Sequence, residues 1–333
     1  MADVPHTTTR YWGVKWRSLK FIKDSLDSYG VETDAITSAC DLFSGTGAVS
    51  WMFANFKRMK YLRSNDSQAY ACIFTKSRTL KSSPHLLDYV READELCKRG
   101  HKGWLTRYHT TIQNDQQLFS REKANAIDCL TQVVPKTDTS AMGSLLDTVL
   151  KQSNGMGTLQ TAANIKYARR SPVSLAPVLP AGRVLGLKHV VTCQDATTIV
   201  LKRNFDIIYI DPPYTTNSNY ERMYHLLNTV AIGDTPVTNG KYNIRSDVKN
   251  SRFALKAHCE DAFKDIIAIC KGKCEIICIS YATYGLVPVT VIKRLLKEAE
   301  FNNIRLFQHT TPKYKEKGVD VTEVLIIGRA LRK

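Results

Sequence analysis

Apolar positions along this chain alternate between short β-rich runs and segments with helical spacing. Apolar runs predict strands at 35–43, 60–64, 189–193, 205–210 and 275–280. Amphipathic spacing predicts helices at 15–29, 48–56, 66–78, 220–230, 259–269 and 289–299. Two extended runs, 303–309 and 321–329, predict an antiparallel pair. This order favours an α/β fold in which helices cover both faces of a sheet.

The pattern changes between residues 83 and 182. Helical stretches at 85–99 and 121–133 alternate there with polar, Gly- and Thr-rich connections, and no run predicts a parallel strand. Prolines, serines and small apolar residues at 171–180 indicate an extended linker. We therefore expect a catalytic domain formed by 1–82 and 183–333 and a mainly helical insertion at 83–182.

The most informative segment is the octapeptide 207–214, which reads Ile-Ile-Tyr-Ile-Asp-Pro-Pro-Tyr. The strand must stop at Asp211, because two successive prolines can neither donate to a ladder nor continue a helix. Asp211 and the carbonyl of Pro212 can each accept one hydrogen from an exocyclic amine, and Tyr214 can stack on the ring that carries it. The plainer alternative is a strand that ends at a Pro-Pro turn behind a capping aspartate.

A second motif, Cys40-Asp41-Leu42-Phe43-Ser44-Gly45-Thr46-Gly47-Ala48, follows the first predicted strand. Glycines at such a turn let the backbone approach a ligand, and the helix start offers unpaired N–H groups. A dinucleotide-binding loop is the rival interpretation, but Ser50 stands where its third glycine or alanine belongs. A lone Gly-x-Gly is weak evidence for a binding site, but its pairing with the distant Asp-Pro-Pro-Tyr is strong evidence.

Together these motifs resemble the S-adenosylmethionine-dependent DNA (adenine-N6)-methyltransferases of the Dam-like and type II restriction-modification group. Tyr11-Trp12-Gly13-Val14-Lys15 resembles the N-terminal motif that closes over the cofactor, and Asn65-Asp66 and Gln194-Asp195-Ala196 resemble its ribose and adenine motifs. Tyr224 to Leu227 and Ile279 to Tyr281 resemble later segments of the family. The similarity covers about 7–80 and 187–330, and it implies a Rossmann-like, seven-stranded sheet with a reversed last hairpin.

The resemblance also implies roles for individual residues. Asp211, Pro212 and Tyr214 would be catalytic, acting on a flipped adenine. The cofactor S-adenosylmethionine would be bound by Tyr11, Lys15, Asp41, Phe43, Gly45, Gly47, Asp66, Asp195 and Asp211. Asp195 has the weakest claim, because an aspartate after a strand is often only a helix cap. No covalent nucleophile is needed, since positioning can supply much of the rate enhancement.

The insertion is the natural target-recognition domain, because the sheet has no spare element to enter a groove. Its candidate DNA contacts are basic residues, joined by a second cluster after the catalytic helix: Lys102, Arg107, Lys166, Arg169, Arg170, Arg245, Lys249 and Arg252. For any single one, a solvated surface charge is the simpler interpretation. The formal net charge of +16 over 333 residues suits a phosphate-backbone partner, and equally an acidic protein or membrane surface.

The remaining expectations concern setting and partners. No apolar run is long enough to span a bilayer, the N-terminus lacks a signal-peptide pattern, and nine cysteines show no paired framework, so we expect a reducing, cytoplasmic setting in a bacterial, phage or viral host. Cys270, Cys274 and Cys278 read as buried thiols, and no metal site is expected. The partner would be double-stranded DNA, with a cognate restriction endonuclease and a monomer or weak dimer left open. Cytosine-N4 or RNA adenine methylation and an inactive DNA-binding relic are the alternatives.

Overall fold

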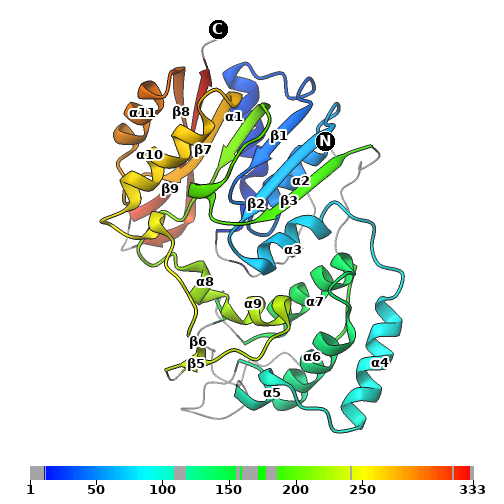
Figure 1. The fold of residues 1–333 in the computed structure, drawn as a ribbon. Helices are drawn as coiled ribbons and strands as arrows, with labels where there is room; N and C mark the ends of the chain where they lie inside the picture. Colours follow the sequence, from blue (N-terminus) through cyan, green and yellow to red (C-terminus); the bar gives the residue numbers. More distant parts are fainter. Residues whose placement is uncertain are drawn as a thin grey trace. The chain divides into compact units, whose positions relative to one another are not determined.

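The computed structural model describes residues 11, 13–108, 118–154, 158–159, 172–177, 186–240, 242–316 and 319–330. The chain packs into two compact units. The sheet unit consists of residues 15–67, 182–219 and 250–333, and the helical unit consists of residues 1–14, 68–181 and 220–249. Each is considered separately below (Figure 1).

The sheet unit is built on a seven-stranded sheet with the order β3-β2-β1-β4-β7-β9-β8. Its strands are β1 (Ser38–Asp41), β2 (Tyr61–Asp66), β3 (Lys188–Cys193), β4 (Phe205–Ile210), β7 (Cys274–Ala282), β8 (Phe301–Glu316) and β9 (Val319–Ala330). The first five in space pair in parallel, whereas β9 runs antiparallel to both β7 and β8. This is the seven-stranded arrangement with a reversed last hairpin that the family resemblance implied.

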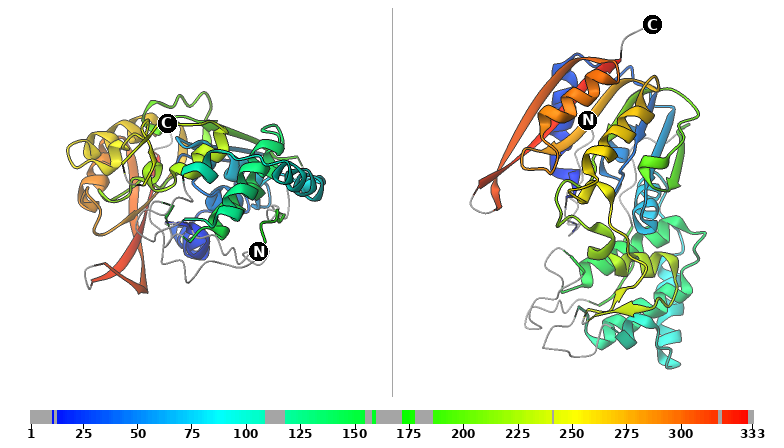
Figure 2. Two further views of the ribbon diagram at one scale, coloured as in Figure 1. Left: turned by 90° about the horizontal axis from the view of Figure 1, so that it is seen from below. Right: turned by 60° about the vertical axis from the view of Figure 1, so that its left-hand side comes forward.

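Helices cover both faces of this sheet. A 3₁₀ turn, η1 (Lys15–Ser18), leads into α1 (Leu19–Tyr29), and together with α2 (Ala48–Ala54) they pack on one face; α10 (Cys259–Cys270) and α11 (Val289–Glu298) pack together on the other side (Figure 1). Strand residues alternate between the two layers: Ile208 and Ile277 belong to the core beneath α10, while Tyr209 lies edge-to-face with Phe53 of α2. The long β8–β9 hairpin extends past the other strands (Figure 2).

The predicted elements of this unit are confirmed with shifts of a few residues at their ends. The expected strand at 35–43 is shorter, because only Ser38–Asp41 pairs with neighbouring strands. The expected strand at 303–309 begins at Phe301 and runs to Glu316, since β9 offers it a partner along most of this length. Short 3₁₀ turns, η3 (Ala196–Thr198) and η4 (Arg252–Ala254), complete the unit.

The helical unit has its own apolar core. Its helices are α3 (Ala69–Ser77), α4 (Leu86–Lys98), α5 (Trp104–Tyr108), α6 (Arg121–Val133), α7 (Thr139–Gln152), α8 (Tyr220–Met223) and α9 (His225–Ile232), with a small hairpin β5 (Thr238–Asn239) and β6 (Ile244–Arg245). The pattern did not predict α7, which buries Leu145, Leu146 and Val149 in this core. Because α3 packs on α7 and α9, this unit includes 68–82 and 220–249 as well as 1–14, so it is larger than the expected insertion at 83–182.

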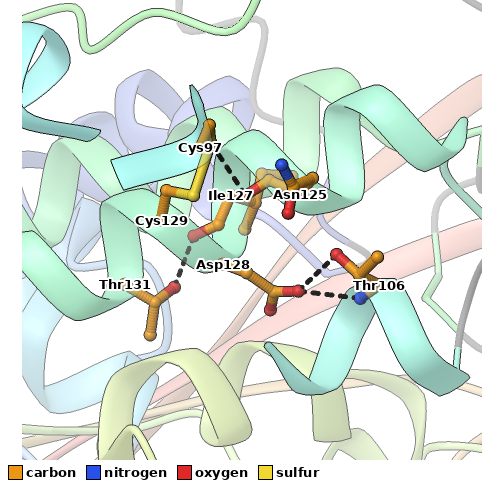
Figure 3. Close-up of a disulfide and its surroundings, with 7 residues drawn as sticks. All are labelled: Cys97, Thr106, Asn125, Ile127, Asp128, Cys129 and Thr131. Carbon is orange, nitrogen blue, oxygen red and sulfur yellow. Dashed lines mark hydrogen bonds between the residues drawn. A yellow bond between two sulfur atoms is a disulfide. The ribbon is translucent and has the colours of Figure 1, made fainter. Parts of the chain in front are cut away.

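A disulfide joins Cys97 of α4 to Cys129 of α6 (Figure 3). The expectation that the cysteines show no paired framework is therefore wrong for this pair, because 32 residues of sequence separation hide a contact that the packing of α4 on α6 creates. The neighbouring Asp128 carboxylate accepts the backbone N–H groups of Leu105 and Thr106 and the Thr106 hydroxyl, which fixes α5 to α6. The disulfide and this carboxylate therefore link α4 and α5 to α6.

The free cysteines of the sheet unit include the three that the sequence placed in α10 and β7. Burial raises the pKa of the Cys270, Cys274 and Cys278 thiols, as expected for apolar packing. Within the described part of the chain, no group of three or more His, Cys, Asp or Glu side chains could hold a metal ion. No helix among the described residues is both long and apolar enough to cross a bilayer.

Candidate active site

The carboxyl ends of three adjacent strands bring acidic side chains to one edge of the sheet. Asp41 ends β1, Asp66 ends β2 and Asp211 follows β4, and β1 lies between the other two strands. The register pairs Asp41 with Tyr209, two residues before Asp211. This edge is where open α/β sheets bind their ligands, so the structure places the two main sequence motifs in one site.

Asp211 is held by a buried lysine from the N-terminal motif. Lys15 Nζ lies 3.1 Å from Asp211 Oδ1 and 3.9 Å from Glu323 Oε1, and its side chain is only 7% exposed. The Ser18 hydroxyl donates to the other oxygen of Glu323 at 2.9 Å. Lys15 was expected to bind the cofactor; in the structure it bridges Glu323 and Asp211, the residue predicted to be catalytic.

The protonation of this group follows from burial and charge. Burial and, to a smaller extent, the Glu323 charge raise the pKa of Asp211 to about 6, against the opposing effects of the Lys15 ammonium and the Ser280 hydroxyl. Burial lowers the pKa of Lys15, but the charges of Asp211 and Glu323 outweigh burial and leave it well above its ordinary value. The site therefore carries one fixed cation between two acids, and Asp211 ionises close to neutral pH.

The rest of the Asp-Pro-Pro-Tyr segment is framed by aromatic rings. Pro212 is buried, and the Tyr214 ring is half-buried with edge-on contacts to Tyr281 and Tyr284 at centroid distances of 5.8 Å. The Tyr214 carbonyl accepts the Leu286 amide, and Lys15 Nζ lies 6.0 Å from the Tyr214 ring centroid. Tyr214 thus has a fixed position in contact with the turn that follows β7.

The glycine loop is fixed by hydrogen bonds to β2. Gly45 and Gly47 both have positive φ, of 50° and 80°, which explains glycine at these positions. The Gly45 amide donates to Asp66 Oδ2 at 2.9 Å, and the Ser44 amide donates to the Asn65 carbonyl. A Cβ added at Gly45 would meet no atom within 4 Å, so the loop faces open space there.

Beneath the loop runs a buried polar chain. The Ser50 hydroxyl donates to Asp41 Oδ2 at 2.6 Å and lies 2.8 Å from the Ser64 hydroxyl, which in turn lies 2.9 Å from His189 Nε2. Burial raises the pKa of Asp41 to about 7, opposed by the Ser50 hydroxyl and reinforced by the charges of Asp211 and Asp66. The sequence marked Ser50 only as a departure from a dinucleotide loop; the structure gives it a partner.

These residues fit S-adenosylmethionine, a cationic ligand with an ammonium, a ribose and an adenine. Asp41 Oδ1 is buried and has no hydrogen-bond partner among the described residues, so an acceptor is available for a cationic donor. Asp66 lies at the end of β2, on the same edge, with one oxygen on the loop. An uncompensated buried acceptor is costly unless a ligand supplies the donor.

Two other expected cofactor residues have local partners. Asp195 is exposed, and its Oδ1 accepts the Thr197 amide and hydroxyl at 2.7 Å, which is the helix-cap role that the sequence offered as its alternative. The Phe43 ring lies edge-to-face with Phe253, at a centroid distance of 5.2 Å. A cofactor role for these two residues stays a prediction.

The first half of the N-terminal motif belongs to the helical unit. Tyr11 stacks on Tyr224 at 4.3 Å between ring centroids, and its hydroxyl lies 2.9 Å from that of Tyr70. Gly13 has a φ of 73°, and a Cβ there would lie 2.5 Å from the Tyr220 hydroxyl. Close packing against α8 therefore explains the glycine of this motif.

The expected DNA contacts have different surroundings. Lys102, Arg107 and Lys249 are exposed, and Arg252 pairs with Asp265 at 2.7 Å. Arg245 is 8% exposed and its guanidinium binds Asp234 and Asp247, so its role as a DNA contact stays a prediction. Lys166, Arg169 and Arg170 lie outside the described residues.

Comparisons with known proteins agree with this site. A family model described as D12 class N6 adenine-specific DNA methyltransferase matches residues 11–268. The chain belongs to this family. The match includes the N-terminal motif, the glycine loop and Asp-Pro-Pro-Tyr.

Individual relatives of this D12-class chain are distant. It is 26% identical to the modification methylase LlaI of Lactococcus lactis subsp. lactis (95% of this chain, 54% of the relative) and 27% identical to the type II methyltransferase M.FokI of Planomicrobium okeanokoites (92% and 50%). It thus spans about half the length of these two. The type II methyltransferase M.NlaIII of Neisseria lactamica is 24% identical, covering 86% of this chain and 87% of the relative. Among solved structures, an S-adenosylmethionine-dependent methyltransferase from Clostridium acetobutylicum ATCC 824 aligns with a TM-score of 0.40 at 9% identity, over 96% of this chain and 93% of that one.

Sequence reasoning missed one charged residue of the D12-class site. Glu323 lies within the apolar run of β9 and carries no local motif, so only the pairing of Ala282 with Glu323 between β7 and β9 brings it to the site. A lone glutamate flanked by Val321, Val324 and Leu325 in a buried strand was the available signal.

Proposed function

We propose that this chain transfers a methyl group from S-adenosylmethionine to the exocyclic N6 amine of adenine in double-stranded DNA. The main support is that Asp211 of Asp-Pro-Pro-Tyr lies at the same edge of the sheet as the glycine loop and the buried Asp41. An amine acceptor and a cation-binding acid on one edge are what an amino-methyltransferase needs.

The residues of the chain supply positioning and proton handling. An aromatic amine is a weak nucleophile because its lone pair is delocalised into the ring. Asp211 and the Pro212 carbonyl accept its two hydrogens and orient the lone pair. When bound, the cofactor supplies an electrophilic methyl group on a sulfonium. When the amine nitrogen takes up the methyl group and the neutral thioether leaves, the Asp211 carboxylate would accept the proton that the nitrogen loses.

Cofactor binding would rest on the edge residues. Asp41 Oδ1 would accept a hydrogen bond from the ammonium, and Asp66 would accept hydrogen bonds from the ribose hydroxyls. Gly45 and Gly47 would leave room for the ligand to approach the backbone. Tyr214 would stack on a base extruded from the duplex, an interaction worth about 1–3 kcal/mol per base.

Radiolabelled methyl transfer to DNA tests the proposal. Asp211→Asn keeps the side-chain volume but removes the anionic acceptor, so turnover should fall by at least about 10²-fold, while calorimetric binding of the cofactor persists. Asp24→Asn, at an exposed pair on α1, is the matched control and should leave turnover unchanged. Methyl transfer by Asp211→Asn at the wild-type rate would refute the assignment.

The same assay separates the alternatives. Label in N6-methyladenine supports the proposal, label in N4-methylcytosine or only in RNA supports a different amine, and no label on any nucleic acid supports an inactive relic. We further propose a modification role, with or without a cognate endonuclease, for a protein that acts as a monomer or weak dimer. Methylome mapping in a methylation-free host and light scattering with DNA test these.

A further inference from the structure

Glu323 is linked to Asp211 through Lys15, which lies between the two carboxylates. One of its oxygens faces the Lys15 ammonium and the other accepts the Ser18 hydroxyl at 2.9 Å. Lys15 and Ser18 are the two ends of one short turn, η1. A single carboxylate from β9 therefore fixes this turn at two points.

The ammonium that Glu323 holds is the one that contacts Asp211. Lys15 Nζ is closer to Asp211 Oδ1, at 3.1 Å, than to Glu323 Oε1, at 3.9 Å. An ammonium carries three donors and can be shared between two acids. The other ionisable groups that act on the Lys15 ammonium are Tyr214 and Tyr209, and burial raises the pKa of Tyr209.

Sharing matters because the Asp211 carboxylate already has partners. In the proposed reaction Asp211 must accept a hydrogen of the substrate amine, while Lys15 lies against its Oδ1 and the Ser280 hydroxyl also bonds to the carboxylate. If Asp211 were the sole partner of a buried ammonium, any rotation of the carboxylate toward the amine would weaken the pairing of the cation, which is strongly unfavourable. A second acid beside Lys15 removes this penalty.

We propose that Glu323 is a positioning residue for methyl transfer, sharing the Lys15 ammonium so that Asp211 can engage the substrate amine. This inference rests on the proposed function and adds a residue to its site. The competing interpretation is a structural ion pair that only fastens η1 to β9. The two differ in whether removal of the Glu323 charge is felt at Asp211.

Glu323→Gln is the deciding variant, because glutamine keeps the shape and can still accept the Ser18 hydroxyl. Since the Glu323 charge raises the pKa of Asp211, the acid limb of kcat/KM should move to lower pH. Turnover at pH 8 should fall about 10- to 100-fold, because Lys15 then competes with the amine for Asp211. The KM for the cofactor should change less than about twofold, since Glu323 is not among the proposed cofactor contacts.

Glu275→Gln is the matched control. Glu275 of β7 forms an exposed pair with Arg329 of β9 at 3.2 Å. The variant therefore removes one carboxylate charge from the same pair of strands, but at a position away from the site. Its turnover and acid limb should equal those of wild type. Ser18→Ala should reduce stability but leave the acid limb in place, because it keeps the Glu323 charge.

A titration of the free protein keeps this inference separate from the proposed function. Carboxyl ¹³C NMR of aspartate-labelled protein should show Asp211 titrating at lower pH in Glu323→Gln than in wild type, whether or not DNA is methylated. An unmoved Asp211 titration, or a Glu323→Gln enzyme with wild-type turnover, would overturn the role of Glu323. Absence of methyl transfer by wild type would instead refute the proposed function.

Discussion

Replacing Asp41 by asparagine should stabilise the free protein at pH 8 while weakening cofactor binding. Asp41 is 1% exposed, and burial raises its pKa from 3.8 to about 7. Oδ2 accepts the Ser50 hydroxyl and the Phe43 backbone N–H also acts on the carboxylate, but these do not offset burial, and Oδ1 has no hydrogen-bond partner among the described residues. The carboxylate is thus held in place for a ligand under conditions that disfavour its charge.

The pKa shift gives both the sign and the size of the effect. An acid whose pKa rises on folding destabilises the folded state above the folded pKa, and the destabilisation disappears as the pH falls below the unfolded pKa. For a rise from 3.8 to about 7 the cost is about 4 kcal/mol at pH 8 and about 1.7 kcal/mol at pH 5. An asparagine amide left without an acceptor costs about 2 kcal/mol at either pH.

Urea unfolding of wild type and Asp41→Asn at the two pH values measures this directly. The variant should be more stable by about 2 kcal/mol at pH 8 and about equal at pH 5. The change of about 2.5 kcal/mol between the two pH values does not depend on the amide penalty. Cofactor affinity by calorimetry should fall about 10- to 100-fold, the value of a hydrogen bond to a charged group.

The control lies on the neighbouring strand. The Asp206 carboxylate of β4 accepts three hydrogen bonds at Oδ2, from the Thr37 amide, the Thr37 hydroxyl and the Ser38 amide, at 2.6–2.9 Å, so its charge is compensated by donors of the chain. Asp206→Asn should be less stable than wild type at pH 8. If Asp41→Asn loses stability at pH 8 as Asp206→Asn does, or shows no difference between pH 5 and pH 8, the view of Asp41 as a strained ligand-binding acid is wrong.

Three further predictions concern other parts of the chain. Because the Asp211 carboxylate must be anionic to accept a hydrogen, kcat/KM for methyl transfer should fall about tenfold per pH unit below its pKa of about 6 and level off above pH 7; a flat profile from pH 5 to 8 contradicts this. Arg245→Met should cost about 2 kcal/mol in urea unfolding, since two partly exposed acids lose their partner, and should leave the salt dependence of DNA binding unchanged; a shallower salt dependence would restore a DNA contact. Serine at both Cys97 and Cys129 should cost about 3–4 kcal/mol, from a cross-link that closes 32 residues, and unfolding that is insensitive to reductant in wild type would show that the pair is not oxidised in solution.

The sheet could be predicted from sequence where apolar runs are continuous. Residues 205–210 and 275–280 read as buried strands because both faces of β4 and β7 are covered. Strand order did not follow from periodicity, because an apolar run shows that a strand is buried but not which strand it pairs with. The family resemblance supplied the order. The helix α7 was missed because Ser140, Gly143, Ser144 and Thr148 interrupt its apolar face, although all four are buried in the core.

The site shows the same division between local and long-range information. Asp211 and the glycine loop carry motifs whose chemistry can be read from a few adjacent residues. Ser50 and Glu323 act through partners 14 and 305 residues away, Ser64 and Ser18, and no local pattern encodes such a pairing. The ion pairs of Arg245 with Asp234 and Asp247 could not be predicted for the same reason, because a basic residue in a polar loop carries no local sign of its partners.

The charge balance of the site leads to a final prediction. Asp41, Asp211 and Glu323 are largely buried, and the Lys15 ammonium pairs with two of them, Asp211 and Glu323, although the chain as a whole has a net charge of +16. At pH 8 this local excess of negative charge favours a ligand that brings a positive charge, and in the proposed reaction the methyl donor is a sulfonium whereas the product is a neutral thioether. An analogue with an amine in place of the sulfonium should therefore bind more tightly than the thioether product at pH 8, and this preference should shrink at pH 5, where Asp41 and Asp211 are protonated. Equal affinities at pH 8, measured by calorimetry, would mean that the acids of this edge are neutralised by groups other than the ligand.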